Sequence, residues 1–465
     1  MASQPSRFDR SLVEGPIGKA VWKLAWPTVL QNMIGGLQGV IDHALVGHLV
    51  GYAGNAAIGV AFQIFLVVMV FIVSLFTGMG VLIARYTGAN DEAAVNRAAW
   101  QAFLTAIALS VGVLAPVGYF LAPHLLGLVN AAPEVQAQAL PYLRIMFVAS
   151  LGMMLFFMLS GALRSAGDAK TPLKMGIALT VLNITFNVIF IRGLGPIPAF
   201  GTKGAAMGMS LAGALLSLFA VWKLFSGRWV IDFRGERWKP DWTIIKLLFK
   251  FGLPTGLQGI AMNVAGVLLL RFLGSVQLSA EAQAAYAIGY TELFSLVTWT
   301  SVGLMGAAAA LAGQNLGAGK PERSMSAVRL AAQYGIGIAT VVGLLFLTIP
   351  KLLLGVFGMD QPEVVRIGVQ LLAYLSVSGL FITVALTYTG GLQGTGDTKS
   401  PLYISIISQF LIPIGLLSIL QSLRPLQPAD VWLAIVIGHF TRCTLSVLRF
   451  RQGKWRQIVV QKPAT

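Results

Sequence analysis

The feature of this chain that most constrains its fold is a series of about twelve long apolar segments joined by short polar connections. A helix that spans a bilayer needs about 20 mainly apolar residues, and each segment has roughly this length or more. The chain is 56% hydrophobic and only 11% charged, whereas a soluble domain is about a quarter charged. We therefore predict an all-α polytopic membrane protein, with no room left in its 465 residues for a separate soluble catalytic domain. The segments lie at residues 20–46, 53–84, 97–122, 135–163, 173–192, 204–225, 244–273, 280–313, 327–354, 364–392, 401–421 and 430–450.

The basic residues orient these segments. The net charge is +16, with 33 Lys and Arg residues against 17 acids, and most basic residues fall on one side if both termini are cytoplasmic. The charge thus indicates cytoplasmic loops and gives no reason to expect a nucleic-acid partner. The few at the opposite ends are Arg144, Arg192, Lys203, Arg271, Lys351, Arg366 and Arg424.

The chain repeats itself. Residues 27–31 (PTVLQ) return as 254–258 (PTGLQ), residues 133–135 (PEV) return as 362–364, and residues 167–173 (GDAKTPL) return as 396–402 (GDTKSPL). Three matches in order at nearly constant spacing indicate an internal duplication. We predict two bundles of six helices related by parallel repeats, with an N-terminal lobe at 1–225, a cytoplasmic interfacial linker at 226–243 and a C-terminal lobe at 244–465 with a basic tail.

Motifs for catalysis are missing from the sequence. The glycine-rich run at 313–320 has the wrong spacing for a phosphate-binding loop, and Pro321 stands where that loop needs Ser or Thr. Cys443 is the single cysteine, which excludes internal disulfides and cysteine-rich metal sites. We therefore expect no enzyme, no cofactor and no metal centre.

One acid stands out inside an apolar segment. Gln31, Gly35, Gln38 and Asp42 share one face of the first predicted helix. A charged carboxylate deep in a bilayer is costly, so it is normally neutral, paired or wet, and desolvation raises a carboxylate's pKa toward the range where a proton gradient can load it. Asp42 is therefore the candidate ion-coupling residue, with Gln31 and Gln38 as candidate substrate contacts. The alternative is an Asp held by a neighbouring helix or lying near the outer surface.

Two further groups are candidates, and a third polar pair is not. Asn183 and Asn187 form a polar pair one helical turn apart, which fits either an ion site or an interhelical hydrogen bond. Glu292, with Tyr286 and Tyr290, can contact a cationic aromatic ligand by charge and cation–π attraction, or it can be a paired structural acid. His439 and Arg442 are interpreted as packing and anchoring at the inner surface.

Two long motifs give a family resemblance. The run 313–323 (GQNLGAGKPER) and the run 163–172 (LRSAGDAKTP) resemble signature loops of the MATE (multidrug and toxic compound extrusion) transporters. Val40-Ile41-Asp42 is similar to the family's first-helix pattern, and Glu292 matches a glutamate common in its eighth helix. The resemblance covers residues 14 to 455.

The resemblance implies twelve helices in two six-helix lobes and export of drugs, expected here to be amphipathic and cationic, in exchange for inward H⁺ or Na⁺. It is nearest to the DinF-like branch, in which the first-helix aspartate takes the proton or joins a Na⁺ site. That role falls on Asp42 with Asn183 and Asn187. Asn187 stands where many relatives have an aspartate, and Met209 where they often have a threonine, which weakens a Na⁺ cage and favours protons.

The expected setting is a bacterial inner membrane, with the lipid bilayer and small molecules as partners and a monomeric protein. An alternative within a related fold is a flippase for lipid-linked precursors. Such a flippase favours a basic central cavity, whereas the candidate residues found here are acidic.

Overall fold

The structure is a computed structural model that describes residues 7–129 and 132–460. Over these residues it is helical and contains no β-strand apart from an isolated bridge between Leu194 and Ile197. Ten described helices are long and apolar enough to cross a membrane, or up to eleven if a helix pair bent by 52° is one span. Helix α2 (Ile17–Val50) is a further long helix of 34 residues. The predicted all-α polytopic fold is confirmed.

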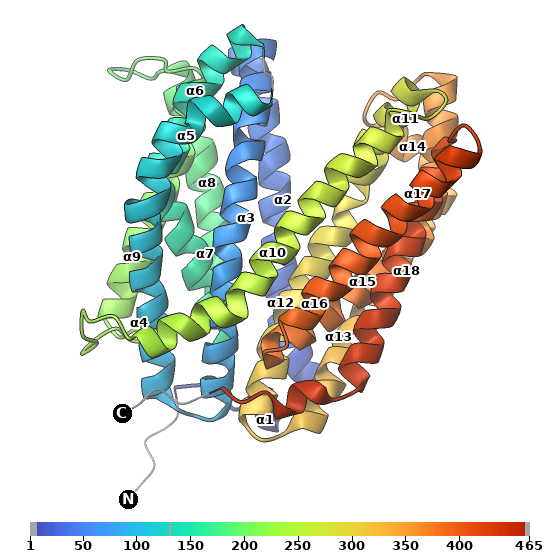
Figure 1. The fold of residues 1–465 in the computed structure, drawn as a ribbon. Coiled ribbons are helices and arrows are strands. Elements are labelled where there is room, and N and C mark those ends of the chain that lie inside the picture. The colour runs from blue at the N-terminus through green and yellow to red at the C-terminus, as the bar shows by residue number, and fades with distance from the viewer. Residues whose placement is uncertain (1–6, 130–131, 461–465) are drawn as a thin grey trace, which may run out of the picture. The chain divides into compact units, whose positions relative to one another are not determined.

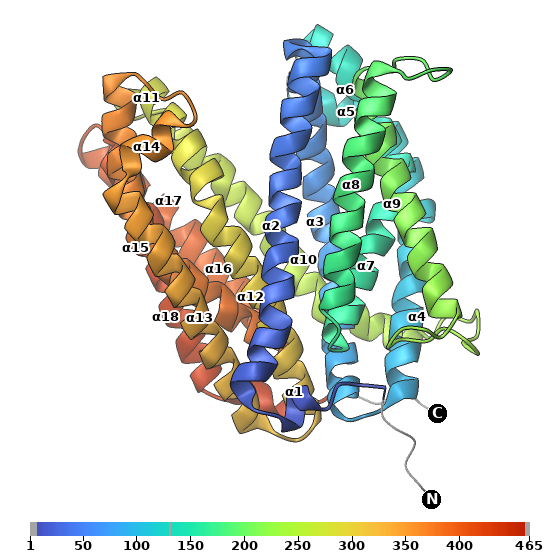
Figure 2. The ribbon, with the colours of Figure 1, turned by 180° about the vertical axis from the view of Figure 1, so that it is seen from behind.

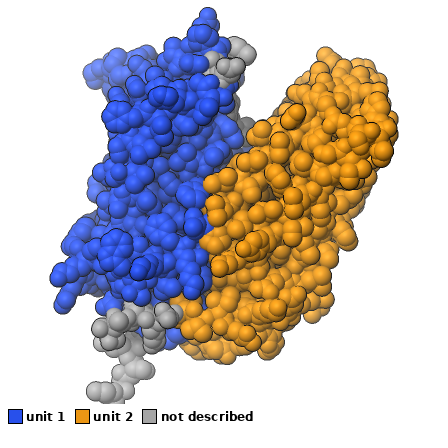
Figure 3. Space-filling model, viewed as in Figure 1, with its two compact units in different colours: residues 1–9, 34–253, 461–465 blue, residues 10–33, 254–460 orange. Residues whose placement is uncertain are grey.

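The chain forms two compact units, which are coloured separately in Figure 3. Of the described residues, unit 1 holds 7–9 and 34–253, and unit 2 holds 10–33 and 254–460. The boundaries fall inside α2 and inside α10 (Trp242–Leu273), and each of these helices contains a proline, Pro27 or Pro254. This division differs from the lobes predicted from the sequence, which placed the boundary at the linker 226–243.

Unit 1 is built on the second part of α2 and a set of helices that run through residue 225 (Figure 1). Helix α9 packs against α8, α7 and α6, and α3 packs against α6 and α7. Alanine, glycine and leucine fill most of the buried face of α9, which allows this close packing. The bounds are α3 Tyr52–Gly88, α4 Glu92–Leu109, the π-helical turn η1 Ser110–Leu114, α5 Ala115–Leu128, α6 Pro133–Val148, α7 Ser150–Ser165, α8 Lys170–Arg192 and α9 Thr202–Phe225.

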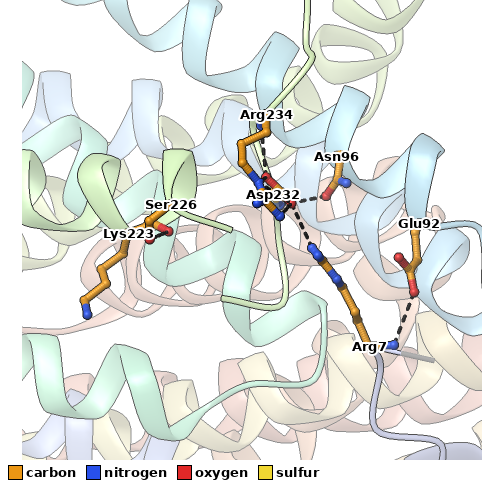
Figure 4. A network of polar contacts seen from close by, with 7 residues as sticks. All are labelled: Arg7, Glu92, Asn96, Lys223, Ser226, Asp232 and Arg234. Carbon is orange, nitrogen blue, oxygen red and sulfur yellow. Dashed lines mark hydrogen bonds and ion pairs between the residues drawn. The ribbon is translucent and has the colours of Figure 1, made fainter. Parts of the chain in front are cut away.

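The basic segment between α9 and α10, which the sequence predicts as an interfacial linker, folds onto α4 of unit 1. The buried ring of Trp100 in α4 stacks edge-on against Phe233, and its Nε1 donates to the carbonyl of Arg237 at 2.7 Å. Asp232 accepts hydrogen bonds from Arg7 at 3.0 Å and from Arg234 at 2.7 Å (Figure 4). Aromatic packing and this ion network therefore fix the segment on α4.

Unit 2 is organised around α15, which packs against α12, α13 and α18. The bounds are α1 Ser11–Glu14, α11 Ser279–Tyr286, the π-helical turn η2 Ala287–Leu293, α12 Ser295–Gly317, α13 Pro321–Thr348, α14 Pro350–Gly355, α15 Pro362–Thr395, α16 Lys399–Ser405, the π-helical turn η3 Ile406–Leu411, α17 Ile412–Leu423, α18 Pro428–Arg451 and the 3₁₀ turn η4 Lys454–Gln457.

The motif at 313–323 has a structural role within unit 2. Lys320 donates to the carbonyl of Val13 at 3.1 Å, and Arg323 donates to the carbonyl of Gly15 at 2.5 Å. These carbonyls belong to the end of α1, where helical bonding leaves acceptors unpaired. The two basic side chains therefore hold the short helix α1 against the ends of α12 and α13.

The duplicated Gly-Asp motif makes the same turn in both halves. Gly167 and Gly396 have φ values of 98° and 99°, a left-handed conformation that glycine adopts without strain. The next residue, Asp168 or Asp397, then accepts a hydrogen bond from the backbone N–H three residues later, which caps the following helix. The repeat is thus preserved because it ends one helix and starts the next.

Candidate ion-coupling site

Asp42 and the asparagine pair meet in unit 1. Helices α2 and α8 lie side by side there (Figure 2), and the Asn187 Nδ2 atom donates to Asp42 Oδ1 at 3.0 Å. The same Nδ2 donates to Asn183 Oδ1, also at 3.0 Å. Asn183 and Asn187 are 0% and 2% exposed. One amide therefore joins the carboxylate of α2 to the neighbouring turn of α8.

A second polar contact joins the same two helices. Thr180 in α8 donates its hydroxyl hydrogen to Gln38 Oε1 at 2.9 Å. Gln38 lies one turn before Asp42, and Thr180 lies three residues before Asn183, so both contacts use single helix faces. Thr180 was not among the residues predicted from the sequence, although its spacing from Asn183 and Asn187 was a signal that would have found it.

Helix α9 and helix α6 complete the surroundings. Gly208 in α9 lies so close to Asn187 that a Cβ built on it would fall within 3.0 Å of the amide oxygen, and the adjacent Met209 is buried. Tyr142 in α6 is 3% exposed and lies close enough to Asp42 to interact electrostatically with it. The sequence around Gly208 or Tyr142 does not reveal that either residue lies near Asp42 and Asn187, because only the packing of α9 and α6 in unit 1 brings them together.

The arrangement supplies one carboxylate among neutral amides, a hydroxyl and a phenol. Asn187 presents its NH₂ group between two oxygens, and a cation binding there would need oxygen atoms turned toward it instead. Among the described residues, Asn183 Nδ2 and Asn187 Oδ1 are buried without a hydrogen-bond partner. The amides therefore have unused donor and acceptor capacity, which lets them adjust when the carboxyl group gains or loses a proton.

The predicted substrate contacts are distributed between the two units. Gln38 lies with Asp42 in unit 1, whereas Gln31 belongs to unit 2, and its Oε1 is buried without a partner among the described residues. Glu292 is half-buried in η2 and forms no ion pair with a described Lys or Arg side chain. The alternative in which a basic residue neutralises Glu292 is therefore not observed.

The two tyrosines are part of the packing of unit 2. The Tyr286 and Tyr290 rings stack at 4.8 Å, and Tyr286 also stacks on Trp432. Their rings thus lie between η2 and α18, against buried aromatic side chains. A π-helical turn such as η2 inserts an extra residue into the helix, which changes the facing of Glu292 relative to a regular helix.

The fold and this site define a polytopic α-helical membrane protein with one amide-bound carboxylate inside a helical unit. A family model, MatE, matches residues 27–189 and again residues 254–417. The chain belongs to the MatE family and is a multi-pass membrane transporter, not an enzyme. The two matches begin at Pro27 and Pro254, which confirms the duplication predicted from the repeated motifs.

The chain is similar to other members along nearly its whole length. It is 28% identical over 451 residues to the "Probable multidrug resistance protein NorM" of Thermotoga maritima, covering 96% of this chain and 94% of that protein. A structure described as an outward-facing conformation of a multidrug resistance MATE family transporter of the MOP superfamily is 22% identical, with a TM-score of 0.89, and the match covers 98% of this chain and 100% of that one. A MOP superfamily transporter from Pyrococcus furiosus, for which a reversed polarity of the binding pocket is reported, has a TM-score of 0.83 at 23% identity, covering 98% and 100%.

Proposed function

We propose that this protein is a secondary active antiporter that exports amphipathic, cationic small molecules in exchange for inward H⁺, with Asp42 as the residue that takes the proton. The family and the drug-resistance relatives support export. The observation that carries the coupling is the single carboxylate held by Asn187 within an otherwise neutral cluster. The proposed setting is a bacterial inner membrane, with both termini cytoplasmic.

The proposed cycle follows from the charge on Asp42. In its ionised form the carboxylate accepts the charge-assisted hydrogen bond from Asn187, and such bonds are stronger than neutral ones. Protonation from outside removes the charge, weakens this bond and lets α2 shift against α8, with Pro27 as the point where α2 can bend. A bound cationic substrate then loses the attraction of the carboxylate and is released outward.

The driving force is sufficient for accumulation. A membrane potential of 100 mV contributes about 2.3 kcal/mol per net translocated charge, and about 1.4 kcal/mol corresponds to a tenfold ratio. The potential therefore drives export of a monovalent cation when two protons enter, whereas a one-for-one exchange moves no net charge and is driven by the pH difference alone. Gln31, Gln38 and Glu292 are proposed as substrate contacts, because amides and an acid complement a cation bearing apolar groups.

The test separates the coupling ions. Purified protein in liposomes receives a pH gradient at equal Na⁺ or a Na⁺ gradient at equal pH, and efflux of a fluorescent cation is followed. We expect transport with the pH gradient only, and we expect Asp42→Asn to abolish it while the protein remains folded in membranes. Transport driven by the Na⁺ gradient alone would replace the proton by Na⁺ at Asp42, Asn183 and Asn187.

Two controls complete the design. Asp360→Asn removes an exposed acid outside the cluster and should transport like the wild type. Normal drug efflux by the Asp42→Asn protein would remove Asp42 from the mechanism. Scrambling of a labelled lipid-linked precursor in the same liposomes, without drug efflux, would favour the flippase alternative.

A further inference from the structure

The guanidinium of Arg442 is an isolated charge inside unit 2. Arg442 lies in α18 and is 2% exposed, and its Nε and Nη1 atoms are fully buried. The sequence assigned Arg442 to packing and to anchoring at the inner surface; its burial agrees with the packing, and α18, the helix that carries it, packs against α15. A cation in the membrane interior is costly unless something compensates its charge.

No acid of unit 2 compensates Arg442 among the described residues. Its Nε and Nη1 atoms are buried and have no hydrogen-bond partner, and the titratable groups that interact with it are the side chains of Tyr290 and His439, neither of which carries a negative charge. The acids of unit 2 that form ion pairs do so with other arginines: Glu14 with Arg10, Glu322 with Arg456, Glu363 with Arg366, Asp397 with Arg449 and Asp430 with Arg424.

A second unpaired group lies on the same face of α18. Ser446 is 0% exposed, and its Oγ also lacks a partner among the described residues. Residues four apart lie on the same helix face, with Cβ atoms about 5–6 Å apart. Three buried donors on one helix face without an acceptor are rare in folded proteins.

Aromatic side chains lie near Arg442. Tyr290, which interacts with Arg442, stacks on Tyr286, and Phe294 lies between Tyr290 and His439, with ring centroids 5.5 and 6.1 Å apart. The His439 Nδ1 atom is already bonded to the Ser378 hydroxyl at 2.5 Å, so it does not serve the guanidinium. None of these neighbours carries a negative charge, so a counter-ion of this single cation must carry one.

We propose that Arg442 and Ser446 bind a small monovalent anion of the halide type within unit 2. The guanidinium Nε–H and Nη1–H groups and the serine hydroxyl donate to the anion, which neutralises the buried charge. The anion acts as a fixed counter-ion that stabilises the packing of α18, α15 and η2. This proposal is independent of the proton coupling at Asp42, which lies in unit 1.

Halide dependence of stability tests the proposal. Full-length protein in detergent is unfolded thermally while sodium gluconate is replaced by sodium bromide at constant Na⁺. A ligand that binds only the folded state raises its stability in a saturable way, so the wild-type Tm should rise to a plateau. Ser446→Ala should need at least about tenfold more bromide for half the effect, and Arg442→Gln should show no saturable rise.

Controls keep the test decisive. Thr444→Ala removes an exposed hydroxyl on the same helix and should respond like the wild type. If Arg442→Gln does not fold, Ser446→Ala and Tyr290→Phe carry the comparison. A bromide anomalous peak beside the guanidinium would support the site directly. Absence of that peak, together with an equal or absent bromide response in all variants, would overturn the proposal and leave water as the occupant.

Discussion

The amide of Asn187 shows what a single residue contributes to the coupling site. Sequence spacing was enough to select Asp42, Asn183 and Asn187, because an acid or a pair of amides inside an apolar segment is rare. Spacing within one helix did not reveal which atom bonds to which. The structure shows that one NH₂ group serves both Asp42 and Asn183, a detail that depends on how α2 and α8 pack.

A substitution at Gly208, which lies in α9 beside Asn187, tests the hydrogen bond from Asn187 to Asp42. In Gly208→Ala the new methyl group would collide with the Asn187 amide oxygen and with the backbone nitrogen of Asn187, so the amide must turn, α9 must move slightly away from α8, and the bond from Asn187 to Asp42 must lengthen or break. We expect proton-driven efflux to fall at least about tenfold, the equivalent of one lost charge-assisted hydrogen bond. Gly161→Ala is the matched control, because its nearest neighbouring atom would lie at an ordinary 3.6 Å.

The ion-paired carboxyl of Asp232 should make the stability of the folded protein depend on pH. The Arg234 guanidinium, with help from Arg7, holds the pKa of that carboxyl well below its usual range. Because the folded pKa lies below the unfolded value of about 3.9, the stabilisation is present above that value and is lost as pH falls below it. Asp232→Asn should lower stability at pH 7 by about 1–3 kcal/mol.

Thermal unfolding of both proteins between pH 7 and pH 3 measures this effect. The difference in Tm between wild type and Asp232→Asn should narrow as the pH falls through about 4. A difference that stays constant with pH would show that the network contributes through packing and not through charge. Burial raises the pKa of the nearby Glu236, which acts in the opposite direction and is common to both proteins.

At the scale of helices, the main departure from the sequence-based description is that α2 and α10 are each divided between the two compact units. Residues 10–33 belong with the C-terminal helices and residues up to 253 belong with the N-terminal ones. Apolar length predicted where each helix runs, but a helix that is apolar on all sides gives no indication of its neighbours. Two glycines on neighbouring helices allow the first part of α2 and the first part of α10 to pack closely against those helices.

Gly303 lies where α12 contacts α2, and Gly78 lies where α3 contacts α10. A Cβ at Gly303 would lie 2.6 Å from the Cα of Val29 in α2, and one at Gly78 would collide with the backbone of Leu248 in α10. Backbone cannot move aside as a flexible side chain can. Gly303→Val and Gly78→Val should each destabilise the protein by about 1–3 kcal/mol or more.

Thermal unfolding in detergent measures the cost, and a third glycine provides the control. A Cβ added at Gly337 in α13 would meet no atom of a neighbouring helix within 4 Å. Gly337→Ala should therefore be neutral or more stable by up to about 1 kcal/mol, because alanine favours the helix. Equal stability of Gly303→Val and Gly337→Ala would show that α12 and α2 are not tightly packed.

At the scale of the whole molecule, the orientation in the membrane remains a prediction from the distribution of basic residues. The single cysteine, Cys443, makes it testable, because Cys443→Ala provides a background without thiols. In that background, Gly195→Cys should react with a membrane-impermeant maleimide in intact cells. Lys239→Cys should react only after the membrane is permeabilised, and the reverse pattern would invert the assigned topology.

The amino-acid sequence alone determined the class of fold and the internal duplication, and it selected the acid that we propose for ion coupling. Each of these follows from local properties: apolar length, repeated motifs, and a charge in an apolar segment. The tertiary structure alone decided that Asn187 donates to Asp42, that Tyr142 and Gly208 lie beside them, and that Arg442 is buried without an ion pair to any described acid. The physical reason is that apolar helix faces resemble one another, so the partners of a buried polar group follow from packing between helices far apart in the chain.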